Sequence, residues 1–231
     1  MSTAALIVAA GSGSRMGHDL PKQYLDIAGK TILRRTLEAF VAHPRIDVLQ
    51  VVIGAGHEEL FARAVMGLRM PMPVIGGATR QQSVLNGLEA LARREMGAPS
   101  VVMIHDAARP FVSAALIGEL LDALEMHEGV IPALPLADTI KQVDEEGIVT
   151  ATLPRHALRA AQTPQTFYLA PILAAHRRAL EEGKTDLTDD AAVAEAAGYE
   201  VATIMGDPRN RKITTPDDLR WAGQQLGSAA R

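Results

Sequence analysis

The sequence predicts an α/β protein with a mostly parallel β-sheet that is flanked by helices. Short apolar runs alternate with longer segments of helical periodicity along the 231 residues, a pattern typical of strand–helix–strand units. The first apolar run, Ala5–Ala9, leads directly into the glycine-rich stretch 11–16. Strands that are connected by crossover helices form parallel sheets covered on both faces, and ligands bind beyond the carboxyl ends of such strands.

The individual elements follow from the apolar runs and the helical periodicity, in chain order. Buried strands are expected at Ala5–Ala9, Val48–Ile53, Pro73–Ile75, Val101–Ile104, Val130–Ala133 and Val201–Met205. Helices are expected at Ile32–His43, Glu58–Met66, Thr79–Arg93, Ala114–His127, Pro171–Glu182 and Asp189–Ala197. A last helix should begin after Thr215, because Pro216 suits the first helical position and Asp218 can reach back to the cap.

One stretch interrupts the alternation. Thr139–Val143 and Ile148–Thr152 are short and strand-like, and the acidic, glycine-containing turn Asp144–Gly147 joins them, so we expect a hairpin. A two-stranded ribbon is marginal alone and must lean on a second subunit or on its own domain. We therefore expect one domain over residues 1–231 with an arm at about 135–158.

Composition excludes several classes of protein and site. The net charge of −4 gives no general attraction to nucleic acid, and the absence of cysteine removes disulfides, thiolate metal sites and cysteine nucleophiles. The apolar run at Ala4–Ala10 lacks a preceding basic residue, which argues against an export signal. No stretch reaches the roughly 18–20 apolar residues that span a bilayer, so we expect a cytoplasmic protein without membrane contacts.

The glycine-rich loop at 11–16 is the first candidate site. Glycines let the backbone approach a phosphate group and direct successive N–H groups at it. Arg15 adds a planar, permanent charge that can bind phosphate oxygens in pairs. A tight turn without a ligand remains the alternative.

Spacing excludes other glycine-rich motifs. A dinucleotide fingerprint requires glycine where Met16 stands. The P-loop-like 29–31 lacks its first glycine, since Tyr24 occupies that position, and neither Ser12 nor Ser14 has the flanking glycines of a nucleophile elbow.

Three further segments carry candidate ligand-binding groups. Lys22 follows the loop closely enough to place a point charge on the same phosphates, although it could also be a solvated surface lysine. Asp106 and Arg109 follow the strand Val101–Ile104, where the carboxylate can hold a hydroxyl or hydrated Mg²⁺, or simply cap the next segment. The turn 76–80 opens a helix whose N-terminus favours anions, although a plain turn explains its glycines equally well.

Taken together, these segments resemble the 2-C-methyl-D-erythritol 4-phosphate cytidylyltransferases of non-mevalonate isoprenoid synthesis. The resemblance covers nearly the whole chain in the family's order, at Ala9–Met16, Pro21–Tyr24, Gly76-Gly77 with Arg80 and Ser83-Val84, His105–Pro110, Asp138–Lys141, Gln162–Gln165 with Phe167, Thr188–Asp190, and Lys212–Thr214 with Asp218-Leu219. It implies a Rossmann-like nucleotidyltransferase fold, a homodimer, and a hairpin arm that reaches over the partner.

The resemblance also implies a role for each matching position. Contacts with CTP would come from Ala9, Ala10, Gly11, Gly13, Gly77, Ala78 and Ser83. The catalytic cations on the phosphates would be Arg15, Lys22 and Lys212. The phosphorylated alcohol would be held by Asp106, Arg109, Thr139 and Arg155, the last three given across the dimer.

The sequence departs from the family's pattern at Val8 and Ala78, where some members have proline and an acidic residue. Because this family's cytosine contacts are largely backbone, neither change alters the assignment. The last predicted helix lies near the end of the sequence, so we expect no fused cyclodiphosphate synthase domain.

The expected reaction is attack by the alcohol's phosphate on the α-phosphorus of CTP, with pyrophosphate leaving. A phosphate dianion needs no general base, so the cations and a Mg²⁺ ion bound mainly through the CTP phosphates would carry catalysis. We expect the histidines to be structural or exposed. The nearest alternative is a ribitol-5-phosphate cytidylyltransferase. Two alternatives come from other classes. Met16 disfavours a nicotinamide dehydrogenase, and the number of charged residues in the candidate site disfavours a non-catalytic nucleotide-binding protein.

Overall fold

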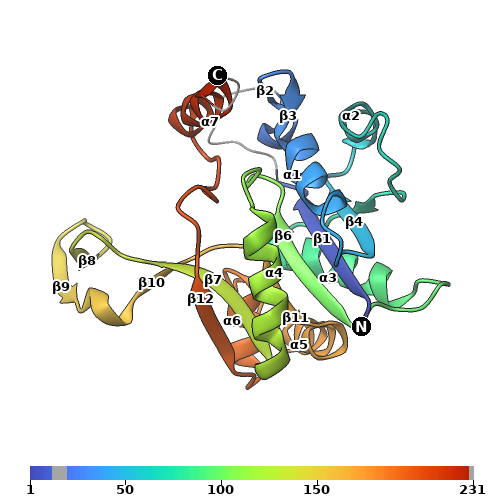
Figure 1. The fold of residues 1–231 in the computed structure, drawn as a ribbon. Helices are drawn as coiled ribbons and strands as arrows, with labels where there is room; N and C mark the ends of the chain where they lie inside the picture. Colours follow the sequence, from blue (N-terminus) through green and yellow to red (C-terminus); the bar gives the residue numbers. More distant parts are fainter. Residues whose placement is uncertain (12–19, 229–231) are drawn as a thin grey trace.

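The computed structural model describes residues 1–11 and 20–228. Its centre is an eight-stranded sheet in the order β10-β7-β11-β6-β1-β4-β5, with β12 also paired to β7 (Figure 1). The strands are β1 Thr3–Ala9, β4 Val48–Ile53, β5 Val74–Ile75, β6 Val101–Asp106, β7 Gly129–Pro135, β10 Arg159–Ala161, β11 Gln165–Tyr168 and β12 Val201–Met205. Within the described part, no helix is both long and apolar enough to cross a membrane.

Six of the described helices pack on the two faces of this sheet (Figure 1): α1 Ile32–Val41, α2 Glu58–Ala64, α3 Arg80–Ala92, α4 Ala114–Ala123, α5 Leu169–Glu181 and α6 Asp190–Ala196. The helix α7, Pro216–Ser228, lies beside β2 and forms a separate small core. Single 3₁₀ turns are η2 Lys22–Tyr24, η3 Leu124–Met126 and η4 Arg155–Ala157, and two small hairpins pair β2 Asp26–Ile27 with β3 Lys30–Thr31 and β8 Ile140–Val143 with β9 Val149–Leu153.

The mostly parallel, helix-flanked sheet predicted from the sequence is confirmed, with one difference. β1 runs parallel to β4 and β6, β4 to β5, and β12 to β7. β11 instead lies antiparallel between β6 and β7, and β10 is antiparallel to β7. Neither strand was predicted from the sequence, because β11 begins with polar residues and β10 is an exposed strand of three residues.

The first strand shows how the two faces are filled. Ala5, Ile7 and Ala9 join the core beneath α1, α2 and α4, whereas Ala4 and Leu6 join the core beneath α3, α5 and α6. This alternation is the two-residue period of a strand that is buried on both faces.

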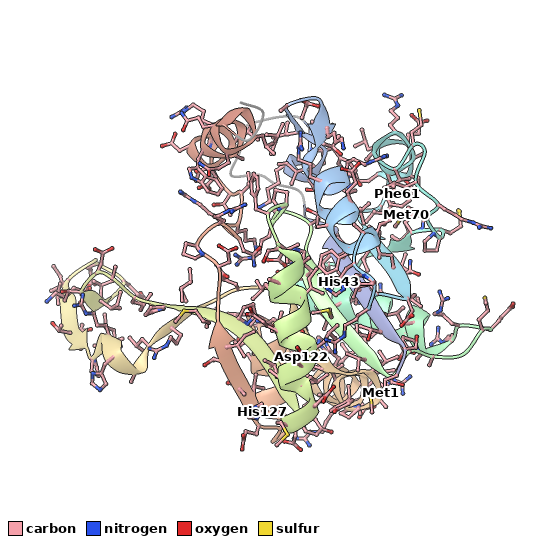
Figure 2. The ribbon with its side chains drawn as sticks, in the orientation of Figure 1. Met1, His43, Phe61, Met70, Asp122 and His127 are labelled. Carbon is pink, nitrogen blue, oxygen red and sulfur yellow. The ribbon has the colours of Figure 1, made fainter. Side chains whose placement is uncertain are left out.

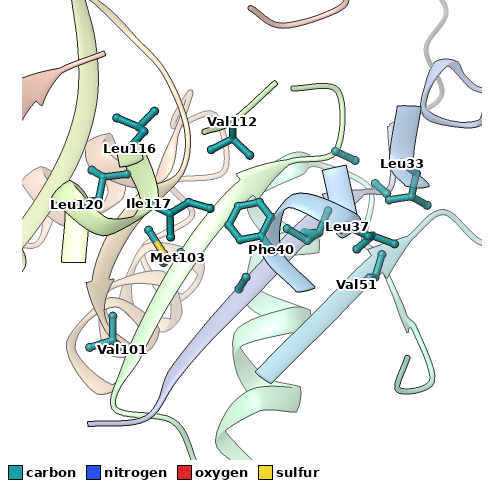
Figure 3. Close-up of a cluster of buried hydrophobic side chains, with 14 of the residues drawn as sticks. Leu33, Leu37, Phe40, Val51, Val101, Met103, Val112, Leu116, Ile117 and Leu120 are labelled. Atoms are coloured by element: carbon teal, nitrogen blue, oxygen red, sulfur yellow. The ribbon is translucent and has the colours of Figure 1, made fainter. Parts of the chain in front are cut away.

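On the first face, Phe40 of α1 lies between its neighbour Leu37 and Ile117 of α4, above Met103 of β6 (Figure 3). All four of these side chains are fully buried. They hold α1 and α4 against the strand whose carboxyl end carries Asp106.

On the second face, α3 approaches the sheet closely at Gly87. A Cβ atom there would stand 2.5 Å from Leu6 Cδ1 and 2.8 Å from Val52 Cγ2. A larger residue would have to displace these buried side chains, so glycine favours the close approach of α3 to β1 and β4.

The predicted hairpin is present and projects beyond the end of the sheet (Figure 1). Its side chains extend into open space, and Val143, Ile148 and Val149 are more than half exposed (Figure 2). The alternative of a hairpin folded back on its own domain is therefore wrong, whereas the use of this arm between subunits stays a prediction.

Helix boundaries differ from the predicted ones mainly at carboxyl ends. The helix predicted at Ala114–His127 ends as α4 at Ala123 and continues as the 3₁₀ turn η3, and α1 ends at Val41 rather than His43. Apolar periodicity persists through such tightened last turns, so it marks the length of the buried face and not the hydrogen-bond pattern.

Candidate functional site

A cavity of about 490 Å³ opens at the carboxyl ends of β1 and β6. Five separate segments line it: the end of β1 with the loop that follows, η2, the turn into α3, the end of β6 with the turn that follows, and the segment before α7. Ligand sites in open α/β sheets lie in this position, beyond strands whose neighbouring connections leave on opposite faces.

Most of the predicted site residues meet in this cavity. Among those that line it are Ala9, Ala10, Gly11, Lys22, Gly77, Ala78, Ser83, Asp106 and Lys212. The predictions for Gly13 and Arg15 lie outside the described residues. Arg109 is positioned just behind the lining, where its Nη1 donates to the carbonyl of Asn210 at 2.8 Å.

The remaining two predicted residues, Thr139 and Arg155, lie on the projecting hairpin and not in this cavity. Both are exposed, and Arg155 donates to the carbonyl of Ala137 within the arm. Within one chain the structure does not bring the arm to the cavity.

Gln23 fixes the start of the glycine-rich loop. It is buried, and its Nε2 donates to the carbonyl oxygens of Ala9 at 2.7 Å and Gly11 at 2.9 Å. These bonds join η2 to the end of β1, so Lys22 is held next to the loop. Gln23 was not predicted as a site residue, because its role depends on a fold that brings η2 back to the strand.

The turn before α3 packs directly on the loop after β1. A Cβ atom at Gly76 would stand 2.6 Å from the Cβ of Ala10 and 2.7 Å from Ser83 Oγ, so this position requires glycine. The backbone N–H of Gly77 donates to Ser83 Oγ at 3.1 Å, and Thr79 caps α3 by accepting from the N–H of Gln82. The cavity wall here is thus the N-terminal end of a capped helix, which favours negative charge.

Asp106 lies at the centre of the charged groups. Its Oδ2 is 2.7 Å from Lys212 Nζ, and its Oδ1 accepts from Arg80 Nε at 3.2 Å. Burial acts to raise the pKa of Asp106, but the charges of Arg80, Lys212 and Arg109 outweigh it and hold this pKa well below its usual range. The carboxylate is therefore ionised at neutral pH, and it pins Lys212 at the cavity wall.

Arg80 was not among the predicted site residues, although it was part of the turn noted there. Its Nε faces Asp106, and its Nη2 donates to Asp190 Oδ2 at 2.8 Å. Burial opposes its charge, but the two carboxylates keep the pKa of Arg80 above its ordinary value. The helix-opening position of Arg80 was visible in the sequence, whereas its partner Asp190 lies 110 residues further along the chain.

His105, beside Asp106, is a structural residue. It is fully buried, with Nε2 3.0 Å from the carbonyl of Arg109 and Nδ1 3.0 Å from Thr163 Oγ1. Burial lowers the pKa of His105 to about 4, so the ring is neutral at physiological pH. It braces the turn that carries Asp106 and Arg109.

Carboxylates are scarce in the cavity. Within residues 1–11 and 20–228, no group of three or more histidine or carboxylate side chains is placed to hold a metal ion. Among the described residues that line the cavity, Asp106 is the one carboxylate, and cations already contact it. Mg²⁺ prefers oxygen ligands and commonly takes most of them from substrate phosphates.

Comparison with protein families gives one match that spans almost the whole chain. The family model of IspD, 2-C-methyl-D-erythritol 4-phosphate cytidylyltransferase, matches residues 3–228.

Curated relatives extend this match. The bifunctional enzyme IspD/IspF of Bradyrhizobium sp. strain ORS 278 is 52% identical over 217 residues, which are 94% of this chain and 54% of the relative. The enzyme of the same name from Nitrobacter winogradskyi is 52% identical over 227 residues, or 98% of this chain and 56% of the relative. The chain thus spans about half the length of these curated relatives.

Solved structures agree with the sequence matches. The 4-diphosphocytidyl-2C-methyl-D-erythritol synthase of Anaerococcus prevotii superposes with a TM-score of 0.84 at 29% identity and covers 98% of each chain. The 2-C-methyl-D-erythritol 4-phosphate cytidylyltransferase of Thermus thermophilus gives a TM-score of 0.77 at 35% identity, over 98% of this chain and all of the other.

Proposed function

Since the chain belongs to the 2-C-methyl-D-erythritol 4-phosphate cytidylyltransferase family, we propose that it transfers the cytidylyl group of CTP to 2-C-methyl-D-erythritol 4-phosphate. The products are 4-diphosphocytidyl-2-C-methyl-D-erythritol and pyrophosphate. One observation carries the proposal: a single cavity joins the loop after β1, the N-terminus of α3, two lysines and the carboxylate of Asp106. That combination suits one polyphosphate and one hydroxyl-bearing phosphate.

In the proposed reaction, a phosphate oxygen of the alcohol attacks the α-phosphorus of CTP. The new P–O bond forms as the bond to the β-phosphate oxygen breaks, and the electron pair leaves with pyrophosphate. The attacking dianion needs no base, so the chain contributes positioning and positive charge. Lys22 and Lys212 line the cavity from two different segments, and Arg15 belongs to the glycine-rich stretch 11–16 that follows β1 in the sequence.

The nucleotide is held mainly by small residues whose backbone can approach it. We assign to CTP the residues Ala9, Ala10, Gly11, Gly13, Gly77, Ala78 and Ser83. The N–H of Gly77 and the hydroxyl of Ser83 already form a hydrogen-bonded pair at the cavity wall. Mg²⁺ would be held mainly through the CTP phosphates, where it would neutralise negative charge.

The acceptor is held by Asp106 and Arg109, together with Thr139 and Arg155 from the arm of a second subunit. The support is that Thr139 and Arg155 are exposed on a hairpin that stands away from its own cavity. The resemblance assigns Arg109 across the dimer as well, whereas in this chain it lies 3.9 Å from its own Asp106. We therefore propose a homodimer with exchanged arms. The cytoplasmic location expected from the sequence stays a prediction.

The decisive experiment is pyrophosphate release measured with CTP, UTP and ATP, each against methylerythritol phosphate and ribitol 5-phosphate. We expect turnover with CTP and methylerythritol phosphate to exceed every other combination. Faster turnover with ribitol 5-phosphate would change the proposed acceptor but leave the proposed reaction, transfer of the cytidylyl group, unchanged. Absence of pyrophosphate release in all combinations would refute the proposed function.

A further inference from the structure

A chain of contacts between ionisable side chains runs from the cavity into the core. Asp106 contacts Arg80, Arg80 contacts Asp190, and the carboxylate of Asp190 lies 3.3 Å from His176 Nε2. The side chain of Asp190 is 1% exposed and that of His176 is fully buried. Asp106 and Asp190 thus bind different nitrogens of one guanidinium group.

Asp190 is held rigidly at this position. It is the first residue of α6, and its backbone N–H donates to Gln165 Oε1 at 2.9 Å, as the N–H of Ala191 does at 3.0 Å. Gln165 in turn donates to Asp189, the cap of α6, from the buried strand β11. The carboxylate of Asp190 is therefore fixed to the central sheet and not to a mobile surface segment.

Arg80 neutralises part of the charge of both carboxylates, and its contacts with both hold its side chain in one orientation. A buried carboxylate without a partner is costly, and an arginine side chain has several rotatable bonds that its contacts must immobilise. Asp190 takes Nη2 and leaves Nε directed at Asp106. Without Asp190, nothing among these contacts stops the guanidinium from turning its fork onto Asp106.

We propose that Asp190 is a positioning residue, which orients Arg80 so that it contacts Asp106 through Nε alone and leaves the remaining lone pairs of that carboxylate able to accept from the hydroxyls of the acceptor. This inference rests on the proposed function for the identity of the acceptor. Misplacement by about 1 Å can cost on the order of 100-fold in rate. The nucleotide should not lose affinity when the charge of Asp190 is removed, since the cavity then becomes more positive.

The test uses Asp190→Asn, which preserves the shape of the side chain and removes its charge. The kcat/KM for the acceptor should fall roughly 10- to 100-fold with a rise in its KM, while the KM of CTP stays equal or falls. Glu195→Gln removes one exposed charge from the same helix, and Val193→Ala loosens the packing of α6 without touching Arg80. Both controls should keep the two KM values even where the melting temperature falls. Equal increases in both KM values, or none, would overturn the proposal.

If Asp190→Asn does not fold, Arg80→Lys takes its place, because an ammonium group cannot span two carboxylates in fork geometry. The same selective increase in the acceptor KM is expected, and an increase in the CTP KM of the same size would count against the proposal.

A spectroscopic measurement separates this inference from the proposed function. The Nε–H proton of Arg80 should give a slowly exchanging NMR signal in the wild-type protein, which Arg80→Lys identifies by its loss. Asp190→Asn should shift this signal and speed its exchange, whereas Glu195→Gln should leave it unchanged. An unaltered signal in Asp190→Asn overturns the positioning role even if the acceptor proves to be another compound.

Discussion

At the scale of single residues, the cavity holds its cations in place before any substrate binds. Lysine has a long, flexible side chain, and immobilising it costs conformational free energy. Asp106 immobilises Lys212 before substrate binds, because it holds Lys212 Nζ at 2.7 Å and its own side chain is only 12% exposed. The position of Lys22 follows from the adjacent Gln23, which binds the end of β1. Preorganised charge of this kind stabilises a transition state without reorganisation during the reaction.

Lys22→Ala and Lys212→Ala should therefore fold normally and lose roughly 10²- to 10³-fold in turnover, by analogy with deletions at oxyanion sites. The same result is expected for Arg15→Ala. Steady-state pyrophosphate release and a thermal melt are the measurements. Lys184→Ala is the control, since Lys184 pairs with Glu182 on the surface. Near-wild-type turnover in a folded variant would remove that residue from the mechanism.

At the scale of elements, the start of α7 determines where Lys212 lies. Asp218 Oδ2 accepts hydrogen bonds from the backbone N–H and the hydroxyl of both Thr214 and Thr215. In return, Thr215 Oγ1 accepts from the backbone N–H of Asp218, so the two residues cap the helix reciprocally, as expected from the sequence. Next to Lys212, the fully buried Ile213 donates its N–H to the carbonyl of Ala108 at 2.8 Å. The cap and this bond therefore anchor the segment that presents Lys212.

Asp218 should make the stability of the protein depend on pH. Burial acts to raise its pKa, but the hydrogen bonds from Thr214 and Thr215 lower the pKa of Asp218 from 3.8 to about 2. Because the folded pKa is depressed, the stabilisation is complete above pH 4 and is lost as the pH falls from about 4 to about 2. It amounts to on the order of 2 kcal/mol.

Denaturant unfolding of Asp218→Asn at pH 6 and at pH 2.5 measures this contribution. The free energy of unfolding should fall below that of the wild type at pH 6, and the gap should narrow at pH 2.5. Asp217→Asn removes the same charge from the same turn, but its side chain is 76% exposed, so little change is expected. A gap that does not depend on pH would show that Asp218 acts through packing.

Some elements were predictable from the sequence, and others were not. β4 and β12 have the predicted bounds, because their apolar, β-branched runs stand out from their neighbours. β11 was missed because Gln165 and Thr166 read as loop residues, yet both are buried, and Gln165 binds the N-terminus of α6. The same limit applies to the site. The segments at strand ends were predictable from local pattern, whereas the bridge from Asp106 through Arg80 to Asp190 exists only after folding.

The arm is the element whose role depends on another molecule. Thr139→Val and Arg155→Ala should raise the KM of the acceptor more than that of CTP, because both side chains are assigned to the acceptor. Steady-state kinetics with each substrate varied in turn is the measurement. Gln142→Ala is a control on the same hairpin, where the exposed side chain has no assigned role. The opposite ranking of the two KM values would assign the arm to the nucleotide.

At the scale of the whole molecule, the projecting hairpin supports the proposed homodimer. It exposes three aliphatic side chains, Val143, Ile148 and Val149, on a two-stranded ribbon that is marginal alone. In a symmetric dimer, the same hairpin on each subunit would reach the partner's cavity. Every acceptor site would then combine Asp106 of one subunit with Thr139 and Arg155 of the other.

Mixing two impaired variants tests this exchange directly when the acceptor is kept well below the raised KM of Arg155→Ala. In a heterodimer of Lys22→Ala with Arg155→Ala, exchanged arms create one site with an intact Lys22 on its own subunit and an intact Arg155 from the partner. After unfolding and joint refolding, random pairing should restore up to about a quarter of wild-type turnover, because half of the dimers are mixed and each has one intact site of two. If each arm served its own cavity, both sites of the heterodimer would remain defective and the mixture would be no faster than the two variants refolded separately. Refolding each variant separately controls for recovery of folded protein, and sedimentation of the mixture verifies that dimers are present. Restored turnover would therefore require two chains for one active site.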